Sequence, residues 1–208
     1  MKALVLLMLG IVFVSGCTQI PTERDISSYA LTEDDFPLPV DFSNHFEVMP
    51  GDPDSANYIS NSYILEGLES VYVSQFSVNA KFSGEQIDKI YEATHVILKF
   101  PVVNGTINTS SNFVTGTDDD RLKLAVISEY INYGVVLSDE NGELNENEIY
   151  EDFGFADNEF VYGFVTDNFI LYGAFFTKDG FMQKISIFGV GIGVDDLKDL
   201  VEKAVNKI

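Results

Sequence analysis

The sequence predicts an α+β domain with an antiparallel sheet, and the last third of the chain carries the clearest evidence. Runs rich in aromatic and β-branched residues predict three strands at Glu159–Thr166, Phe169–Thr177 and Phe181–Gly189. Asp179-Gly180 between the last two runs favours a tight hairpin, because such a turn needs positive φ. A terminal helix follows, with Asp195 expected at its N-cap and one apolar stripe made of Val194, Leu197, Leu200, Val201, Ala204, Val205 and Ile208. A strand meander followed by a packed terminal helix is typical of an α+β domain.

The first part of the chain predicts extended segments and loops. Tyr29 to Pro37 leads into the folded part, and Phe36 is expected to be extended because it precedes a proline. Residues 50–57 are dense in turn formers and predict a loop. A β-rich run then predicts a strand over residues 70–80.

Two helices are predicted in the middle of the chain. Ser83 and Gln86 have the spacing of a capping box, and apolar residues follow at helical spacing, so we expect a helix over residues 84–97. Three acids at Asp118–Asp120 precede a second helical pattern, which ends at Gly134. Acidic residues interact favourably with the helix dipole at the amino end, and glycine favours termination of the helix.

This order of elements resembles the PsbP-type domain, the family of the extrinsic P protein of photosystem II and of many prokaryotic lipoproteins. The similarity rests on the Phe36-Pro37 segment, a strand, a Ser-capped helix, a meander that turns at Lys178-Asp179-Gly180 and the terminal amphipathic helix. It covers roughly residues 30–208 and is strongest over Phe155–Ile208. The resemblance implies an α/β/α sandwich around an antiparallel sheet, in proteins that bind or assemble and do not catalyse. An acidic insert at 138–152 departs from the family pattern, and no functional residue of the family has a clear counterpart here.

The amino terminus predicts a lipoprotein signal peptide over residues 1–16. Lys2 precedes an apolar stretch, Ala3–Val14, and Val14-Ser15-Gly16-Cys17 resembles the lipobox of prokaryotic lipoproteins. As a helix the apolar stretch spans roughly 18 Å, which is short of the ~30 Å hydrocarbon core of a bilayer. We therefore expect cleavage before Cys17, whose thiol takes the diacylglyceryl group that anchors the protein durably.

The predicted organisation follows from that anchor. Residues 17–28 are polar and are expected to form a lipidated tether, and residues 29–208 to form a single domain on the extracytoplasmic side of the cell membrane. Cys17 is the only cysteine in the chain, so a disulfide, a thiol nucleophile and a cysteine-ligated zinc site are all excluded.

The charge is strongly negative and unevenly spread. The chain has 33 acidic and 12 basic residues, a formal charge of −21, and no basic residue lies between Lys123 and Lys178. Such a field repels phosphate backbones, so nucleic acid is excluded as a partner. Apolar residues make up 46% of the chain, which is enough to bury a core. Solubility or adaptation to salt explains the acids most simply, and binding of cations or of a basic partner is the alternative.

Candidate sites for chemistry are weak. Gly189-Val190-Gly191-Ile192-Gly193 lacks the spacing of a dinucleotide-binding loop and is interpreted as a flexible connection between strand and helix. Residues 139–148 are rich in oxygen ligands, but they fail the EF-hand template for calcium. His45 and His95 support neither a zinc site nor a catalytic triad, and His95 is expected to pack near a helix end. Asn104 and Asn108 match the N-glycosylation pattern.

Three functions stay open at this level, and no catalytic residue, metal ligand or cofactor is assigned. The first is a non-catalytic, lipid-anchored envelope protein whose domain binds a protein partner or a small ligand. The second is a calcium-binding envelope protein that uses the acidic stretch at 139–152. The third is an extracytoplasmic hydrolase, which would need a concave site holding at least two carboxylates with shifted pKa values.

Overall fold

A seven-stranded antiparallel sheet forms the centre of the domain. The computed structural model describes residues 25–48, 68–79, 89–103, 106–107, 116–134, 137, 147–165 and 169–208. Within them the sheet has the strand order β1 (Val40–Val48), β2 (Ser70–Asn79), β3 (Ile90–Lys99), β9 (Phe181–Val190), β8 (Ile170–Lys178), β7 (Asp157–Val165) and β6 (Asn147–Tyr150). The smaller elements are a β4–β5 ribbon (Val102–Val103 and Thr106–Ile107) and two short 3₁₀ helices, η1 (Ile26–Tyr29) and η2 (Glu33–Asp35).

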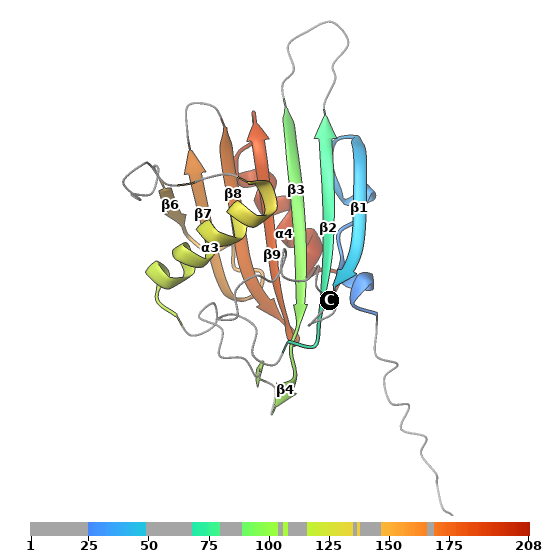
Figure 1. Ribbon diagram of the computed structural model, residues 1–208, viewed down its shortest axis with the longest axis vertical. Coiled ribbons are helices and arrows are strands. Elements are labelled where there is room, and N and C mark those ends of the chain that lie inside the picture. Colours follow the sequence, from blue (N-terminus) through green and yellow to red (C-terminus); the bar gives the residue numbers. More distant parts are fainter. Residues whose placement is uncertain are drawn as a thin grey trace, which may run out of the picture.

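One helix covers each face of this sheet. Helix α3 (Asp118–Tyr133) crosses one face over β7 to β9, and α4 (Val194–Val205) lies behind the sheet on the other (Figure 1). Each helix has its own core cluster, with Leu200 of α4 buried against β9 and Leu122 of α3 buried near Phe160 of β7. The predicted fold class, an α+β domain built as an α/β/α sandwich around an antiparallel sheet, is confirmed. No helix of the described part of the chain is long and apolar enough to cross a membrane.

Local chemistry explains the elements that were predicted correctly. Asp179 and Gly180 have φ of 45° and 89°, so the β8–β9 hairpin turns where the sequence indicated. Gly134 ends α3 in the left-handed conformation, with φ of 65°. Thr117 caps the start of this helix, because its hydroxyl accepts a hydrogen bond from the backbone of Asp120. Phe36 is extended before its proline, also as expected.

The predicted helix over 84–97 is wrong, because residues 90–99 form β3. Ile90, Tyr91 and Thr94 have helical spacing, but the same run also alternates. Every residue of β3 is paired with β2 on one side and with β9 on the other. Two complete ladders of backbone hydrogen bonds outweigh a weak helical preference. The expected capping box at Ser83–Gln86 lies outside the described residues.

The N-cap of helix α4 lies two residues earlier than expected, so Asp195 does not hold that position. Gly193 holds that position, and the Asp196 carboxylate accepts a hydrogen bond of 2.8 Å from the Gly193 N–H. The predicted apolar stripe is confirmed, and its buried members are Leu197, Leu200, Val201, Ala204 and Val205. Gly191 has a φ of 71°, so the glycine-rich segment is a turn between β9 and α4.

Several sequence predictions lie outside the described residues and stay predictions. They are the signal peptide with Cys17, the loop at 50–57, the acceptors Asn104 and Asn108, and the acidic stretch up to residue 146. The chain is described from Asp25, and Ile26 of η1 is already buried together with Tyr29 and Ile97.

Candidate functional site

A row of polar side chains crosses the sheet face that α3 covers. The register places Asn44 of β1 beside Gln75 of β2, Gln75 beside Thr94 of β3, and Thr94 beside Ser186 of β9. Apolar residues flank the row on the same face, such as Val73 and Val96. Asn44 is exposed and Gln75 is half-buried, whereas Thr94 and Ser186 are buried. Buried polar groups cost free energy unless they are hydrogen-bonded, so the inner end of the row needs partners.

A buried ion pair lies beneath α3, two residues from Ser186 along β9. Lys184 of β9 lies 2.9 Å from Glu129 Oε1 and donates a hydrogen bond of 2.8 Å to Ser128 Oγ. The side chains of Glu129 and Lys184 are 0% and 2% exposed, so water does not screen the pair. The Tyr162 hydroxyl donates a hydrogen bond to Glu129 Oε1 as well. Gly173 leaves room for that ring, because a Cβ there would lie 2.2 Å from Tyr162 Cζ.

Burial sets the pKa values in this buried group. Desolvation lowers the pKa of Lys184, and the charge and hydrogen bond of Glu129 oppose the shift. Desolvation also raises the pKa of Tyr162 well above its ordinary value, and the nearby Glu129 carboxylate adds to this rise. Glu129 Oε2 is buried without a hydrogen-bond partner in the described part of the chain. The arrangement fixes one salt bridge under α3, in a place that a ligand does not reach.

Tyr133 connects the ion pair with the open end of the row. It lies one turn after Glu129 on α3, so the two side chains share a face of the helix. Its hydroxyl donates to the Ser186 carbonyl oxygen at 3.1 Å, and its ring stacks on Phe188 at 5.2 Å between centroids. Burial, reinforced by the Glu129 charge, raises the pKa of Tyr133, while hydrogen bonds with Ser186 and Thr94 oppose the rise.

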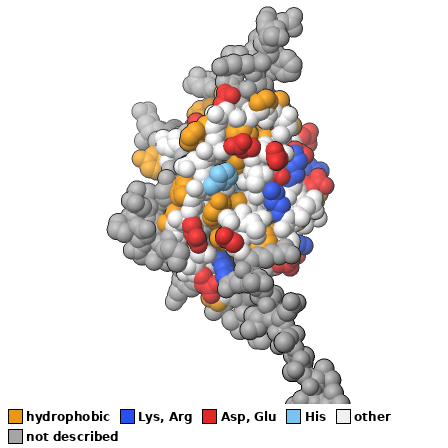
Figure 2. Space-filling view, turned by 90° about the vertical axis from the view of Figure 1, so that its right-hand side faces the viewer, with side chains coloured by type: hydrophobic (Ala, Val, Ile, Leu, Met, Phe, Trp, Pro, Cys, Tyr) orange, Lys and Arg blue, Asp and Glu red, His pale blue; other side chains and the backbone are white. Residues whose placement is uncertain are grey.

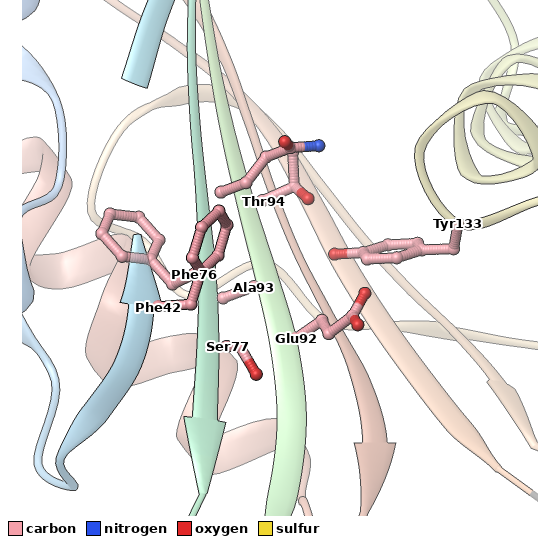
Figure 3. Close-up of a pocket in the computed structure, with 8 residues that line it drawn as sticks. Phe42, Phe76, Ser77, Glu92, Ala93, Thr94 and Tyr133 are labelled. Atoms are coloured by element: carbon pink, nitrogen blue, oxygen red, sulfur yellow. The ribbon is translucent and has the colours of Figure 1, made fainter. Parts of the chain in front are cut away.

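A pocket of about 220 Å³ opens beside Tyr133, where the polar row meets β1 to β3. Figure 3 shows Phe42 and Tyr133 on opposite sides of this pocket, with Glu92 and Ser77 between them and Thr94 above. Three strands and the last turn of α3 therefore build it. The residues that line it are Phe42, Gln75, Phe76, Ser77, Glu92, Ala93, Thr94 and Tyr133.

The lining has a one-sided charge. Of the described lining residues, Glu92 is the only charged one, and none is a lysine or arginine. Among the residues that the structure describes, no salt bridge joins Glu92 to a basic side chain. Phe42 is 60% exposed, an unusual amount for a phenylalanine, and gives the pocket an apolar wall.

Neither histidine is among the eight lining residues, although the His45 ring contacts Phe76 at 5.3 Å between centroids. His95 is buried in strand β3 and not in the expected helix, and it packs against Leu31, in the short link between η1 and η2. Its Nδ1 accepts a hydrogen bond from the Leu31 N–H, and its Nε2 donates to Gln183 Oε1 at 2.8 Å. His45 lies on β1 with its Nδ1 3.0 Å from the Ser74 hydroxyl.

The acids do not gather into a metal site in the described part of the chain. No group of three or more histidine, cysteine or carboxylate side chains there could hold a metal ion. On the β1 side of the molecule, acidic side chains are spread among polar and apolar ones (Figure 2). The calcium hypothesis concerned residues 139–152, most of which lie outside the described residues, and it stays a prediction.

Sequence reasoning missed both the ion pair and the pocket. Lys184 and Ser186 stand inside a run otherwise rich in apolar residues, and that interruption was the available signal. Their partners come from α3 and β3, so only the tertiary structure brings these groups together.

Comparisons with known proteins do not assign this chain to a family. No family model matches the chain, and no curated protein matches it. The extracellular domain of PknH from Mycobacterium tuberculosis is similar over 80% of this chain and 85% of that one, with 10% identity and a TM-score of 0.40. A similarity at this level says nothing about function, and the resemblance to PsbP-type domains stays a prediction.

Proposed function

We propose that this protein is a lipid-anchored, extracytoplasmic binding protein whose domain holds a small molecule in the pocket between Phe42, Glu92 and Tyr133. The observation that carries the proposal is the pocket itself, in which polar groups of β2 and β3, Ser77 and Glu92 among them, lie between the aromatic walls of Phe42 and Tyr133. Pockets that combine apolar walls with a few convergent polar groups are the usual form of a small-molecule site.

The chemistry of the lining supports binding without catalysis. Among the lining residues that the structure describes, the titratable ones are Glu92 and Tyr133. Burial raises the pKa of Tyr133, so its hydroxyl stays protonated at neutral pH and is no base. Acid–base catalysis commonly needs a second group with a complementary pKa, and none of the eight lining residues supplies one.

The lipobox at Cys17 supports the anchor. The expected mature protein begins at Cys17, and a short tether before the buried Ile26 separates the lipid from the folded domain. Intact-mass analysis after membrane extraction tests this part. We expect a chain that begins at Cys17 and is heavier by its acyl groups, and no such species from Cys17→Ser. A chain that begins at Met1 with a free thiol would contradict the anchor.

A blocked pocket tests the binding part. Ser77→Phe places a ring in the pocket, whereas Ser28→Phe places the same ring on an exposed position of η1. Saturation-transfer NMR with three one-ring probes, 2-phenylethylamine, 2-phenylethanol and phenylacetate, is the measurement. At least one probe should give a signal with the native protein and with Ser28→Phe, but none with Ser77→Phe. If no probe signal depends on Ser77, the pocket is not the binding site.

A further inference from the structure

We propose that the pocket takes a small organic cation, a primary amine attached to a ring or short apolar body, and that Glu92 is its counter-ion. This inference rests on the proposed binding function and names the ligand class. The arguments come from the charge of the lining, its hydrogen-bonding groups and its aromatic walls.

The charge of the lining disfavours an anionic ligand. Glu92 has no basic neighbour among the eight lining residues, so a carboxylate or phosphate would meet a like charge and gain no compensating ion pair. On the same face Lys184 is the candidate to neutralise Glu92, but Lys184 is already held by Glu129 at 2.9 Å. Glu92 is exposed to solvent, and a cationic ligand would give it an ion-pair partner. The chain's charge of −21 also raises the concentration of small cations near the surface.

The hydrogen-bonding groups fit a primary ammonium. An ammonium has three donors and no acceptor, so it needs several oxygen atoms around it. Glu92, Ser77 and Gln75 bring a carboxylate, a hydroxyl and an amide oxygen from neighbouring strands into one lining. Ser77 and Glu92 are direct cross-strand partners, which places one hydroxyl next to the carboxylate.

The aromatic walls fit the apolar part of such a ligand. Phe42 and Tyr133 lie on opposite sides of the pocket (Figure 3), so a ring or short chain can lie between them. Aromatic faces also attract a cation, and that attraction strengthens when water is excluded. At about 220 Å³, the pocket is smaller than the ~300–1,000 Å³ that drug-sized ligands occupy, so it holds one ring and a short chain.

Matched probes separate this inference from the proposed function. Titration calorimetry compares 2-phenylethylamine, 2-phenylethanol and phenylacetate, which share a ring and differ in charge. We expect the amine to bind about fivefold more tightly than the alcohol, as suits one partly solvated ion pair, and phenylacetate to bind most weakly. Added salt should reduce the preference for the amine and leave binding of the alcohol nearly unchanged.

Two variants test the role of Glu92. Glu92→Gln should remove the preference for the amine and retain the affinity for the alcohol. Glu47→Gln, on the opposite face of β1, removes the same charge from the molecule and should change neither affinity. Melting curves of both variants show whether the fold is retained.

Each outcome has one meaning. If the alcohol or phenylacetate binds more tightly than the amine, and Ser77→Phe still abolishes that binding, the amine is not the preferred ligand class. The pocket would then remain the binding site. An amine preference that survives Glu92→Gln, or that Glu47→Gln removes equally, would also overturn the inference. Absence of binding by all three probes would overturn the inference and the proposed function together.

Discussion

His95 should make the stability of the fold depend on pH below neutrality. Its ring is fully buried between two fixed partners, the Leu31 N–H, which donates to Nδ1, and the Gln183 side chain, which accepts from Nε2. Because Nδ1 already accepts a hydrogen bond, a proton added there would face the Leu31 N–H. Burial lowers the pKa of His95 from 6.5 to about 4, against the opposing effect of its hydrogen bond to Gln183.

The sign and size follow from proton linkage. Between a pKa of about 4 in the folded state and 6.5 in the unfolded state, the unfolded chain binds more protons at this position, so stability falls as the pH falls. The contribution is fully present above pH 6.5, and its complete loss would amount to roughly 3 kcal/mol. From about pH 7.5 to about pH 5 the same relation gives a loss of about 2 kcal/mol.

Urea unfolding of the native protein and of His95→Asn measures this contribution. Asparagine can still accept from Leu31 but does not titrate, so the variant is less stable at every pH and lacks the His95 slope. Other groups, His45 included, are common to both proteins and cancel in the difference. We expect the native protein to lose about 2 kcal/mol more than the variant between about pH 7.5 and about pH 5. Parallel pH curves for the two proteins would refute the reasoning.

Three further substitutions test the packing under α3 and around β7. Lys184→Met leaves the Glu129 carboxylate buried without its partner, so the free energy of unfolding in urea should fall by about 3–5 kcal/mol. The double variant with Glu129→Gln should recover much of this loss. A loss below about 1 kcal/mol would contradict a buried pair. Gly173→Ala brings a methyl group within 2.2 Å of Tyr162, so the ring must move, and we expect a cost of roughly 1–3 kcal/mol and a changed near-ultraviolet spectrum of the tyrosines. Glu159→Ala removes a carboxylate that accepts three backbone N–H bonds from residues 154–156, so amide exchange of these residues should accelerate while α4 stays protected.

The elements that the sequence predicted correctly are those with local signals. The β7–β9 meander has alternating apolar residues and an Asp-Gly turn, and α3 has acids at its start and Gly134 at its end. The fold class followed from these elements and the terminal helix. Strand β3 was missed because its decisive partner, β9, lies far along the chain, and its own residues fit a helix and a strand equally well.

The candidate site could not be predicted because its residues come from four separate elements. A lysine within an apolar strand indicates that a partner exists, but no pattern in the chain identifies Glu129 as that partner. Likewise, Glu92 is one of 33 acids, and only the register of β2 and β3 places it beside Ser77 in a pocket.

A crystal structure of the protein grown with 2-phenylethylamine tests the central claim most directly. The account predicts density for the probe between Phe42 and Tyr133, with its nitrogen about 3 Å from the Glu92 carboxylate. Probe density elsewhere on the molecule, with this pocket filled by a protein side chain, would contradict it.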